Sequence, residues 1–142
     1  NPYIAKVISW LHTSIAQGLV TKSPEGARKM LEIMKRGGAL SMLGDQKLRE
    51  GIPVPFFGRP AMTPQAIAKL ALKFDCPLIP VRVERLEGVH CRVTYYPPIP
   101  MPKEGSLNDK VYEIMCQVNK YLEDWIRERP EQWIWVHNRW PS

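Results

Sequence analysis

Apolar residues recur at helical spacing in four stretches of the chain, so that each stretch has one apolar face. The predicted helices cover residues 2–17, 24–36, 64–74 and 108–128. Their inward positions are Ile4, Val7, Ile8, Leu11 and Ile15 in the first, Met30, Leu31 and Met34 in the second, Ile67, Leu70, Ala71 and Phe74 in the third, and Val111, Ile114, Met115, Val118, Leu122, Trp125 and Ile126 in the fourth. A last short helix is expected from Pro130 and includes Trp133, Ile134 and Trp135.

Two of these helices begin with the same local signal. Ser23-Pro24 and Thr63-Pro64 each pair a side chain that can cap a helix with a proline at the first helical position. Glu25 then places an acid in the first turn, where the helix dipole favours it. Gly37-Gly38 predicts the end of that helix.

Short apolar runs predict strands between the helices. Ala39–Leu43 is almost wholly apolar, which is typical of a strand buried on both faces of a parallel sheet. Leu78–Glu84 is interpreted as a second buried strand and Cys91–Tyr96 as a third, with a hairpin-like connection around Gly88. Residues 19–21 predict a short strand and residues 54–57 an extended segment. This order predicts a single α/β domain with a central, mostly parallel sheet and flanking helices.

Composition and charge narrow the class of protein. The chain has 142 residues, of which 44% are hydrophobic, and a formal net charge of +6. Such a charge favours anionic partners: nucleic acid, anionic lipid, phosphorylated substrates or an acidic carrier protein. The three cysteines are widely spaced without a CxxC pair, which favours buried thiols in a reducing compartment over a zinc site. No apolar stretch is long enough to span a membrane.

Polar and aromatic residues gather where the predicted strands end. Because ligands of open α/β sheets bind beyond the carboxyl ends of the strands, these residues are candidates for ligand binding. The candidate substrate-binding residues are Asp45, Gln46 and Lys47 after the Ala39–Leu43 run, Phe56 and Phe57, Arg59 in the next loop, and Arg82 in the second strand. They suit a ligand with a phosphorylated or sugar head and an apolar tail. The alternative is a solvated loop whose charges only confer solubility.

Several kinds of chemistry lack their signatures. GxSxG and GxxxxGK[ST] are both absent, so neither a nucleophile elbow nor a phosphate loop is expected. The sequence predicts no metal site and no cofactor. The tail "RERPEQWIWVHNRW" combines arginines with tryptophans, as nucleic-acid-binding proteins do, but its spacing favours a C-terminal element packed on a core. An amphipathic edge that contacts a membrane is a third interpretation.

The ordered motifs resemble a known family. "MKRGGALSMLGDQKLREGIPVPFFGRPAMT" is followed by "AKLALKFDCPLIPVR" and then by "NKYLEDWIRERPEQWIWVHNRWP". This set resembles the bacterial lipid A biosynthesis acyltransferases, the late lauroyl and myristoyl transferases of the lysophospholipid acyltransferase superfamily. The resemblance covers essentially the whole chain and corresponds to the C-terminal half of such an enzyme. It implies part of a glycerol-phosphate-acyltransferase-like fold.

The resemblance also implies a reaction. Such enzymes transfer a fatty acyl chain from acyl carrier protein to a hydroxyl of a lipid A precursor, at the cytoplasmic face of the inner membrane. Asp45, Gln46, Lys47, Arg59 and Arg82 would then contact the head group, and Phe56 and Phe57 would line the path of the acyl chains.

The catalytic signature of the family is a histidine with an acid five positions later. Here those positions hold Gln17, Tyr95 and Ser142. We therefore expect the general base, and a membrane-associated helix, to lie outside these 142 residues, and the chain alone to be inactive, with Asp45 at most supporting catalysis.

A departure in the tail, a misleading motif and two alternative functions complete the prediction. The tail has Asn138 where the family more often has arginine, and "SPEGAR" at residues 23–28 only imitates the phosphate motif of the superfamily. One alternative function is a non-catalytic module that binds lipid or acyl carrier protein. The other is a nucleic-acid-binding domain, although no motif of that class is present.

Overall fold

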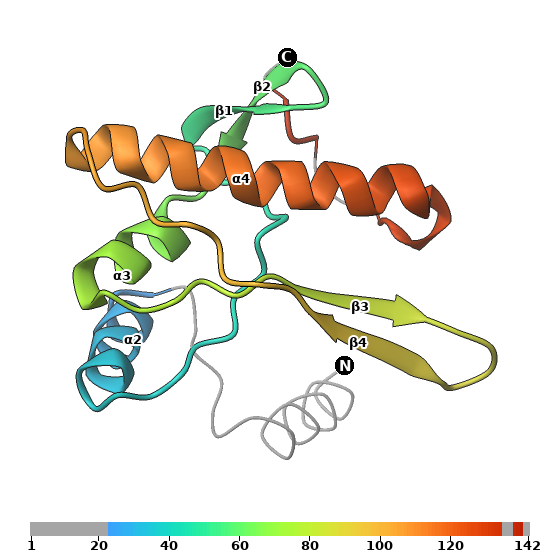
Figure 1. Ribbon diagram of the computed structural model, residues 1–142, viewed down its shortest axis with the longest axis horizontal. Coiled ribbons are helices and arrows are strands. Elements are labelled where there is room, and N and C mark those ends of the chain that lie inside the picture. Colours follow the sequence, from blue (N-terminus) through green and yellow to red (C-terminus); the bar gives the residue numbers. More distant parts are fainter. Residues whose placement is uncertain (1–22, 135–137, 141–142) are drawn as a thin grey trace. The chain divides into compact units, whose positions relative to one another are not determined.

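The computed structural model describes residues 23–134 and 138–140. The chain forms two compact units, Asn1–Ser41 and Met42–Ser142, each of which is described by itself. The described part of the first unit contains helix α2 (Pro24–Lys35). The second unit contains β1 (Ile52–Phe56), β2 (Arg59–Thr63), α3 (Ala66–Phe74), β3 (Val81–Arg85), β4 (Cys91–Tyr95), α4 (Leu107–Glu128) and the 3₁₀ turn η1 (Pro130–Gln132) (Figure 1).

Helix α2 begins as the sequence predicts. The hydroxyl of Ser23 accepts a hydrogen bond from the Gly26 N–H at 3.1 Å, with Pro24 at the first helical position. Glu25 lies in the first turn, so its role at the helix start is confirmed. Gly37 adopts φ +74° directly after the helix, which explains why a glycine ends it.

Strands β1 and β2 form an antiparallel hairpin that packs on α4 (Figure 1). The side chains of β1 alternate: Val54 and Phe56 are buried, whereas the prolines at positions 53 and 55 are exposed. Ala61 and Thr63 are the buried positions of β2. The prediction gave only an extended segment here and missed β2, so the hairpin itself is a finding of the structure.

Helix α4 organises the second unit. Ser106 and Asp109 form a capping box at its start, in which each side chain accepts from the backbone N–H of the other residue. Its buried side chains Val111, Ile114 and Met115 pack with Val54 and Ala68 into one core cluster. Ile126 joins Phe56 and Ala61 in a second cluster. The predicted apolar stripe of this helix is therefore confirmed at its buried positions.

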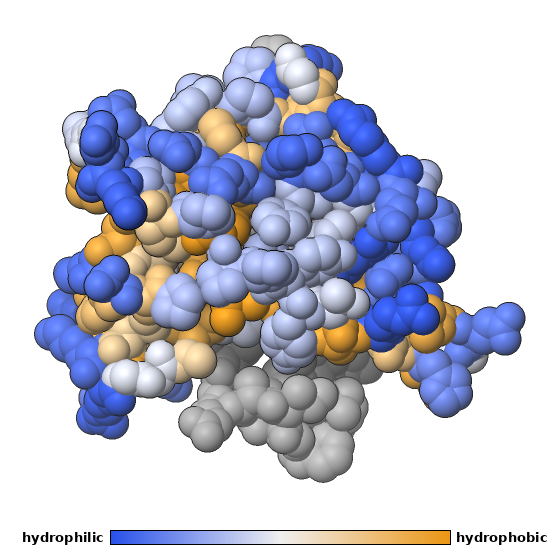
Figure 2. All heavy atoms as spheres, viewed as in Figure 1, coloured by the Kyte–Doolittle hydropathy of each residue, from blue (hydrophilic) through white to orange (hydrophobic). Residues whose placement is uncertain are grey.

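The hairpin of β3 and β4 reverses the expected burial of its strands. Arg82 and Glu84 are 8% and 9% exposed, whereas Val83 is 63% and Val93 is 51% exposed. Ion pairs explain the reversal: Arg82 contacts Glu128 of α4, and Glu84 lies 3.5 Å from Arg129. On the face shown in Figure 2, apolar residues reach the surface among charged ones in the region of this hairpin.

The predicted parallel sheet is wrong for the described residues. Their strands form two antiparallel pairs, β1 with β2 and β3 with β4, so the protein is α/β without the predicted central parallel sheet. Ala39–Leu43 is not a strand, and Leu43 is 73% exposed. An apolar run becomes a buried strand only when neighbouring strands accept its backbone hydrogen bonds, and no strand of the described residues pairs with it.

Other predicted boundaries also change. Thr63 does not cap a helix, because it ends β2 and its hydroxyl donates to the Ala61 carbonyl; α3 begins at Ala66. The predicted last short helix does begin at Pro130, but it is the 3₁₀ turn η1 and ends at Gln132, so the prediction that it includes Trp133 is wrong. The predicted helix 2–17 and strand 19–21 lie outside the described residues.

We expect Ser106→Ala to lower the free energy of unfolding by about 1 kcal/mol, because it removes the acceptor that caps α4. Urea unfolding followed by circular dichroism measures this change. An exposed serine that caps no helix, Ser41, is the matched control, and Ser41→Ala should leave the midpoint unchanged. Equal midpoints for the two variants would contradict the capping role.

We also expect the contribution of Asp109 to the stability of the fold to disappear at acid pH. Hydrogen bonds from the Ser106 hydroxyl and N–H hold the pKa of the Asp109 carboxyl below its usual range. A lowered pKa in the folded state stabilises the fold above the unfolded pKa, and this stabilisation is lost as pH falls through the folded pKa. Asp109→Asn should therefore be less stable than the parent at neutral pH, and the difference should shrink as pH falls below the ordinary pKa of an aspartate. A difference that stays constant across this range would overturn the prediction.

Candidate functional site

The loop that carries Asp45, Gln46 and Lys47 is fixed at its start by packing. A Cβ added to Gly44 would lie 3.4 Å from the Val118 side chain, so the backbone of this glycine lies close to α4. The three polar residues that follow are each half-buried. The loop is therefore held against α4 before its polar residues begin.

Arg139 also holds this loop in place. Its Nη1 donates to the backbone carbonyl of Asp45 at 2.8 Å, and its Nη2 lies 3.4 Å from the Thr63 hydroxyl. Its guanidinium lies 4.6 Å from the centre of the Phe56 ring, and its own carbonyl accepts from the Met62 N–H. One side chain near the end of the sequence thus joins the polar loop to the β1–β2 hairpin.

Burial of this guanidinium has an electrostatic consequence. Arg139 is 1% exposed, and burial lowers the pKa of its guanidinium, an effect that the negative charge of Asp45 partly offsets. An arginine nonetheless stays protonated at any physiological pH. The positive charge is therefore retained inside the protein, where carbonyl, hydroxyl and ring face replace water.

Asn119 extends this polar network to α4. Its side-chain amide donates to the Pro55 carbonyl at 3.0 Å and lies 3.4 Å from the Thr63 hydroxyl. The Thr63 hydroxyl in turn donates to Ala61 O, so its one donor and both of its acceptor positions are used. The site rests on this buried network, which ties α4, β1 and β2 together.

An aromatic stack continues from Arg139 towards the surface. The rings of Phe56 and Trp140 are stacked with centroids 5.8 Å apart, and the Trp140 indole donates to Phe56 O. Arg59 lies over the Trp140 ring, with its guanidinium carbon 5.4 Å from the ring centre. The structure thereby connects three predicted site residues, Asp45, Phe56 and Arg59, through two residues of the tail.

Phe57 occupies the turn between β1 and β2 in a conformation that aromatic residues rarely adopt. Its φ is +51° and that of Gly58 is +73°, the pattern of a two-residue hairpin turn that favours Asn-Gly. Its N–H donates to Glu123 at 2.7 Å, and Arg127 lies 4.6 Å from its ring. A bulky side chain at positive φ costs of the order of 1 kcal/mol, which points to a function for the ring.

The ion pairs of Arg82 involve residues outside the polar loop, the buried network and the aromatic stack. It pairs with Glu128 and Glu84 on the hairpin side of α4. Burial lowers the pKa of its guanidinium, but hydrogen bonds to Glu128 and Tyr96 and the charges of the two glutamates outweigh burial, so the pKa is raised. Its charge is already balanced by carboxylates, which sets it apart from Arg59 as a candidate for phosphate binding.

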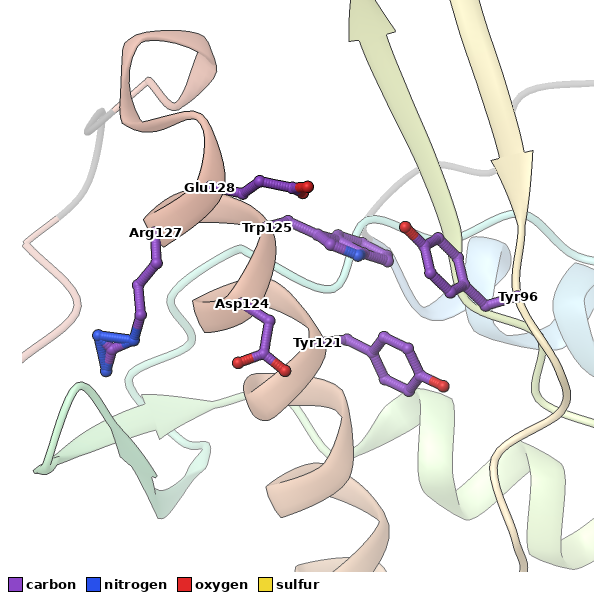
Figure 3. Close-up of a pocket in the computed structure, with 6 residues that line it drawn as sticks. All are labelled: Tyr96, Tyr121, Asp124, Trp125, Arg127 and Glu128. Atoms are coloured by element: carbon purple, nitrogen blue, oxygen red, sulfur yellow. The ribbon is translucent and has the colours of Figure 1, made fainter.

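A shallow pocket lies between the end of β4 and α4. It is lined by Tyr96, Tyr121, Asp124, Trp125, Arg127 and Glu128 (Figure 3). The three aromatic rings touch one another, with centroids 5.2 to 5.7 Å apart, while Arg127 is directed away from them. The rings thus pack the segment after β4 onto the helix.

Two kinds of feature are not found among the described residues. Within residues 23–134 and 138–140, no three histidine, cysteine or acidic side chains lie together as metal ligands would. None of the helices in that part of the chain has the length and apolar character needed to cross a bilayer. His90, which lies in the hairpin turn, is exposed, whereas His12 and His137 fall outside the described residues.

The sequence prediction missed the residues that assemble the site. Arg139, Thr63 and Asn119 were not among the candidates, although all three are buried and polar. A polar residue on the apolar stripe of a helix was the available signal for Asn119, which lies one position after Val118. The tail tryptophans were interpreted as packing residues, and this is confirmed for Trp133 and Trp140.

We expect Phe57→Asn to be more stable than Phe57→Ala by about 1 kcal/mol. Both variants lose the ring, but asparagine tolerates positive φ far better than alanine does. Comparing the two variants separates backbone strain from the loss of aromatic contacts. Chemical denaturation measures the difference in their free energies of unfolding. An alanine variant at least as stable as the asparagine variant would show that the turn carries no strain.

Comparison with known proteins bears on the whole chain. Its residues 1–142 match the family model described as bacterial lipid A biosynthesis acyltransferase. A search of curated proteins gives no match. The match supports an acyltransferase whose acceptor belongs to lipid A synthesis, and it agrees with a site that combines cations, hydrogen-bonding groups and aromatic surface. Because the match extends over the full 142 residues, the chain belongs to the bacterial lipid A biosynthesis acyltransferase family.

Proposed function

We propose that the protein takes part in transfer of a fatty acyl chain from acyl carrier protein to a hydroxyl of a lipid A precursor. In this proposal the loop of Asp45, Gln46 and Lys47 contacts the head group of the acceptor. The observation that carries the proposal is the connection of this loop to Phe56 and Arg59 through Arg139 and Trp140. A glycolipid acceptor needs polar groups and apolar surface side by side, and this connection provides both.

The charges of the site fit a phosphorylated acceptor. Lys47 is half-buried and Arg59 is exposed, and the ion pairs formed among the described residues include neither of them. Hydrogen bonds from charged donors such as lysine and arginine to phosphate are shorter and stronger than those between neutral groups. Lys47 would act as a point charge and Arg59, held over Trp140, as a planar donor.

The chemical step would use groups from outside these residues. A general base would remove the proton from the acceptor hydroxyl, and this oxygen would attack the thioester carbonyl of the acyl donor. The tetrahedral oxyanion that forms needs hydrogen-bond donors close by. Its collapse would break the C–S bond, and the thiol of acyl carrier protein would leave with the proton that the base had taken. The base would be a histidine beyond this chain, and membrane association at the cytoplasmic face of the inner membrane would come from a segment beyond it.

We expect Asp45→Asn and Asp45→Ala to reduce kcat/KM for acyl transfer at least tenfold, about 1.4 kcal/mol of transition-state stabilisation. The fold should survive, because Arg139 bonds to the backbone carbonyl of Asp45 and both variants keep it. The assay uses protein expressed from the complete gene, acyl–acyl carrier protein and a lipid A precursor. Glu50→Ala, an exposed acid in the same loop, is the control and should transfer normally. Wild-type transfer by both Asp45 variants would remove Asp45 from the acceptor site.

The phosphate contacts have a separate test. Lys47→Ala and Arg59→Ala should each raise the KM for a phosphorylated acceptor, since each loses a cation that meets the anion. The effect should shrink with the dephosphorylated acceptor, while the KM for the acyl donor stays constant. An equal loss with both acceptors would assign these residues to another role. Lipid binding by the wild type without any transfer would instead favour the non-catalytic binding module.

A further inference from the structure

We propose that Arg139 is the positioning residue of the acceptor site, and that its guanidinium sets where the Asp45–Lys47 loop lies relative to the β1–β2 hairpin. This inference rests on the proposed function for its catalytic consequence. Its structural part concerns only contacts within the second unit. Arg139 itself is 1% exposed, so it acts through the residues it holds.

The contacts of Arg139 reach segments that are far apart in the sequence. Asp45 is 94 positions away and Thr63 is 76 positions away. Phe56 of β1 lies beneath its guanidinium, and the Met62 N–H of β2 donates to its carbonyl. A single side chain therefore contacts the loop, both strands of the hairpin and, through Thr63, the network of Asn119 in α4.

The guanidinium has the geometry that these contacts need. Its two terminal nitrogens donate to Asp45 O and to the Thr63 hydroxyl, while its flat face lies against an aromatic ring. A lysine ammonium is a compact point charge that cannot donate along two fixed directions and stack at the same time. Lysine at this position would keep the charge but lose the arrangement.

Burial explains why this contact restrains the loop. The Arg139 Nε already lacks a hydrogen-bond partner among the described residues, so the terminal nitrogens satisfy the buried cation. If the loop moved and Asp45 O left Nη1, a second donor would lose its partner inside the protein. An unsatisfied donor on a buried charge is costly, so displacement of the loop is strongly disfavoured.

The test compares Arg139→Lys and Arg139→Gln with the parent. Glutamine removes the buried charge, so that variant avoids an uncompensated cation and should fold. For both variants we expect the acceptor KM to rise at least tenfold and the donor KM to stay constant. NMR order parameters of the Asp45, Gln46 and Lys47 amides should fall from about 0.85 towards 0.6 or below.

Two controls separate positioning from general loss of stability. Met115→Ala leaves a cavity in the other core cluster and lowers stability without touching Arg139, so its loop should stay rigid. In Arg139→Ala, millimolar guanidinium chloride should restore transfer by refilling the site, although guanidinium destabilises proteins in general. Sodium chloride at the same concentration should not restore it.

Each outcome decides one claim. A rigid loop and parental acceptor KM in Arg139→Lys and Arg139→Gln overturn the proposal, as does loop disorder of equal size in Met115→Ala. If the parent protein transfers no acyl groups, the proposed function fails, and the order parameters still decide whether Arg139 positions the loop.

Discussion

A positive charge buried between a loop, a hairpin and a helix governs the second unit of this protein. Among the described residues no carboxylate forms an ion pair with Arg139, and its charge is stabilised by a carbonyl, a hydroxyl and an aromatic face that belong to separate segments. Each of these groups must stay in place, because a buried charge without such partners strongly destabilises the folded state. The position of the polar loop, the register of β1 with β2 and the stacking of the tail are therefore linked.

Around this charge, α4 serves as the scaffold. Its apolar positions pack with β1 and α3, and its Asn119 holds the hairpin through Pro55 and Thr63. Glu123 and Glu128 near its C-terminal end bind the Phe57 turn and Arg82 of β3. The two sheets thus attach to the same helix by different means: β1 and β2 mainly by apolar burial, and the inner face of β3 by ion pairs.

The turn of Phe57 and Gly58 shows a conflict between stability and the proposed function. A turn with positive φ at both positions favours small or Asx residues, yet the first position holds a phenylalanine. Its ring lies beside Phe56 and Arg127 at the tip of the hairpin. Strain retained at such a position is typical of functional sites, and an apolar ring at this tip suits the acyl path of the proposed reaction.

The sequence by itself determined the elements that depend on neighbouring residues. The Ser23 cap, the start of α2 and the long apolar stripe of α4 follow from local hydrogen bonding and helical spacing, and all are observed. The motifs from "DQK" to the tryptophan-rich tail also identified the family, because the order of motifs can be compared between sequences without knowing which residues are in contact.

Only the tertiary structure decided which residues meet. The apolar run Ala39–Leu43 has the composition of a buried strand, but within the part of the chain that the structure describes no strand pairs with it, so composition alone misleads. Arg82 and Glu84 are buried because they form ion pairs with Glu128 and Arg129. The alternation of polar and apolar residues along a strand cannot predict such pairs. The role of Arg139 depends on partners 94 and 76 positions away, and such long-range contacts arise only when the chain has folded.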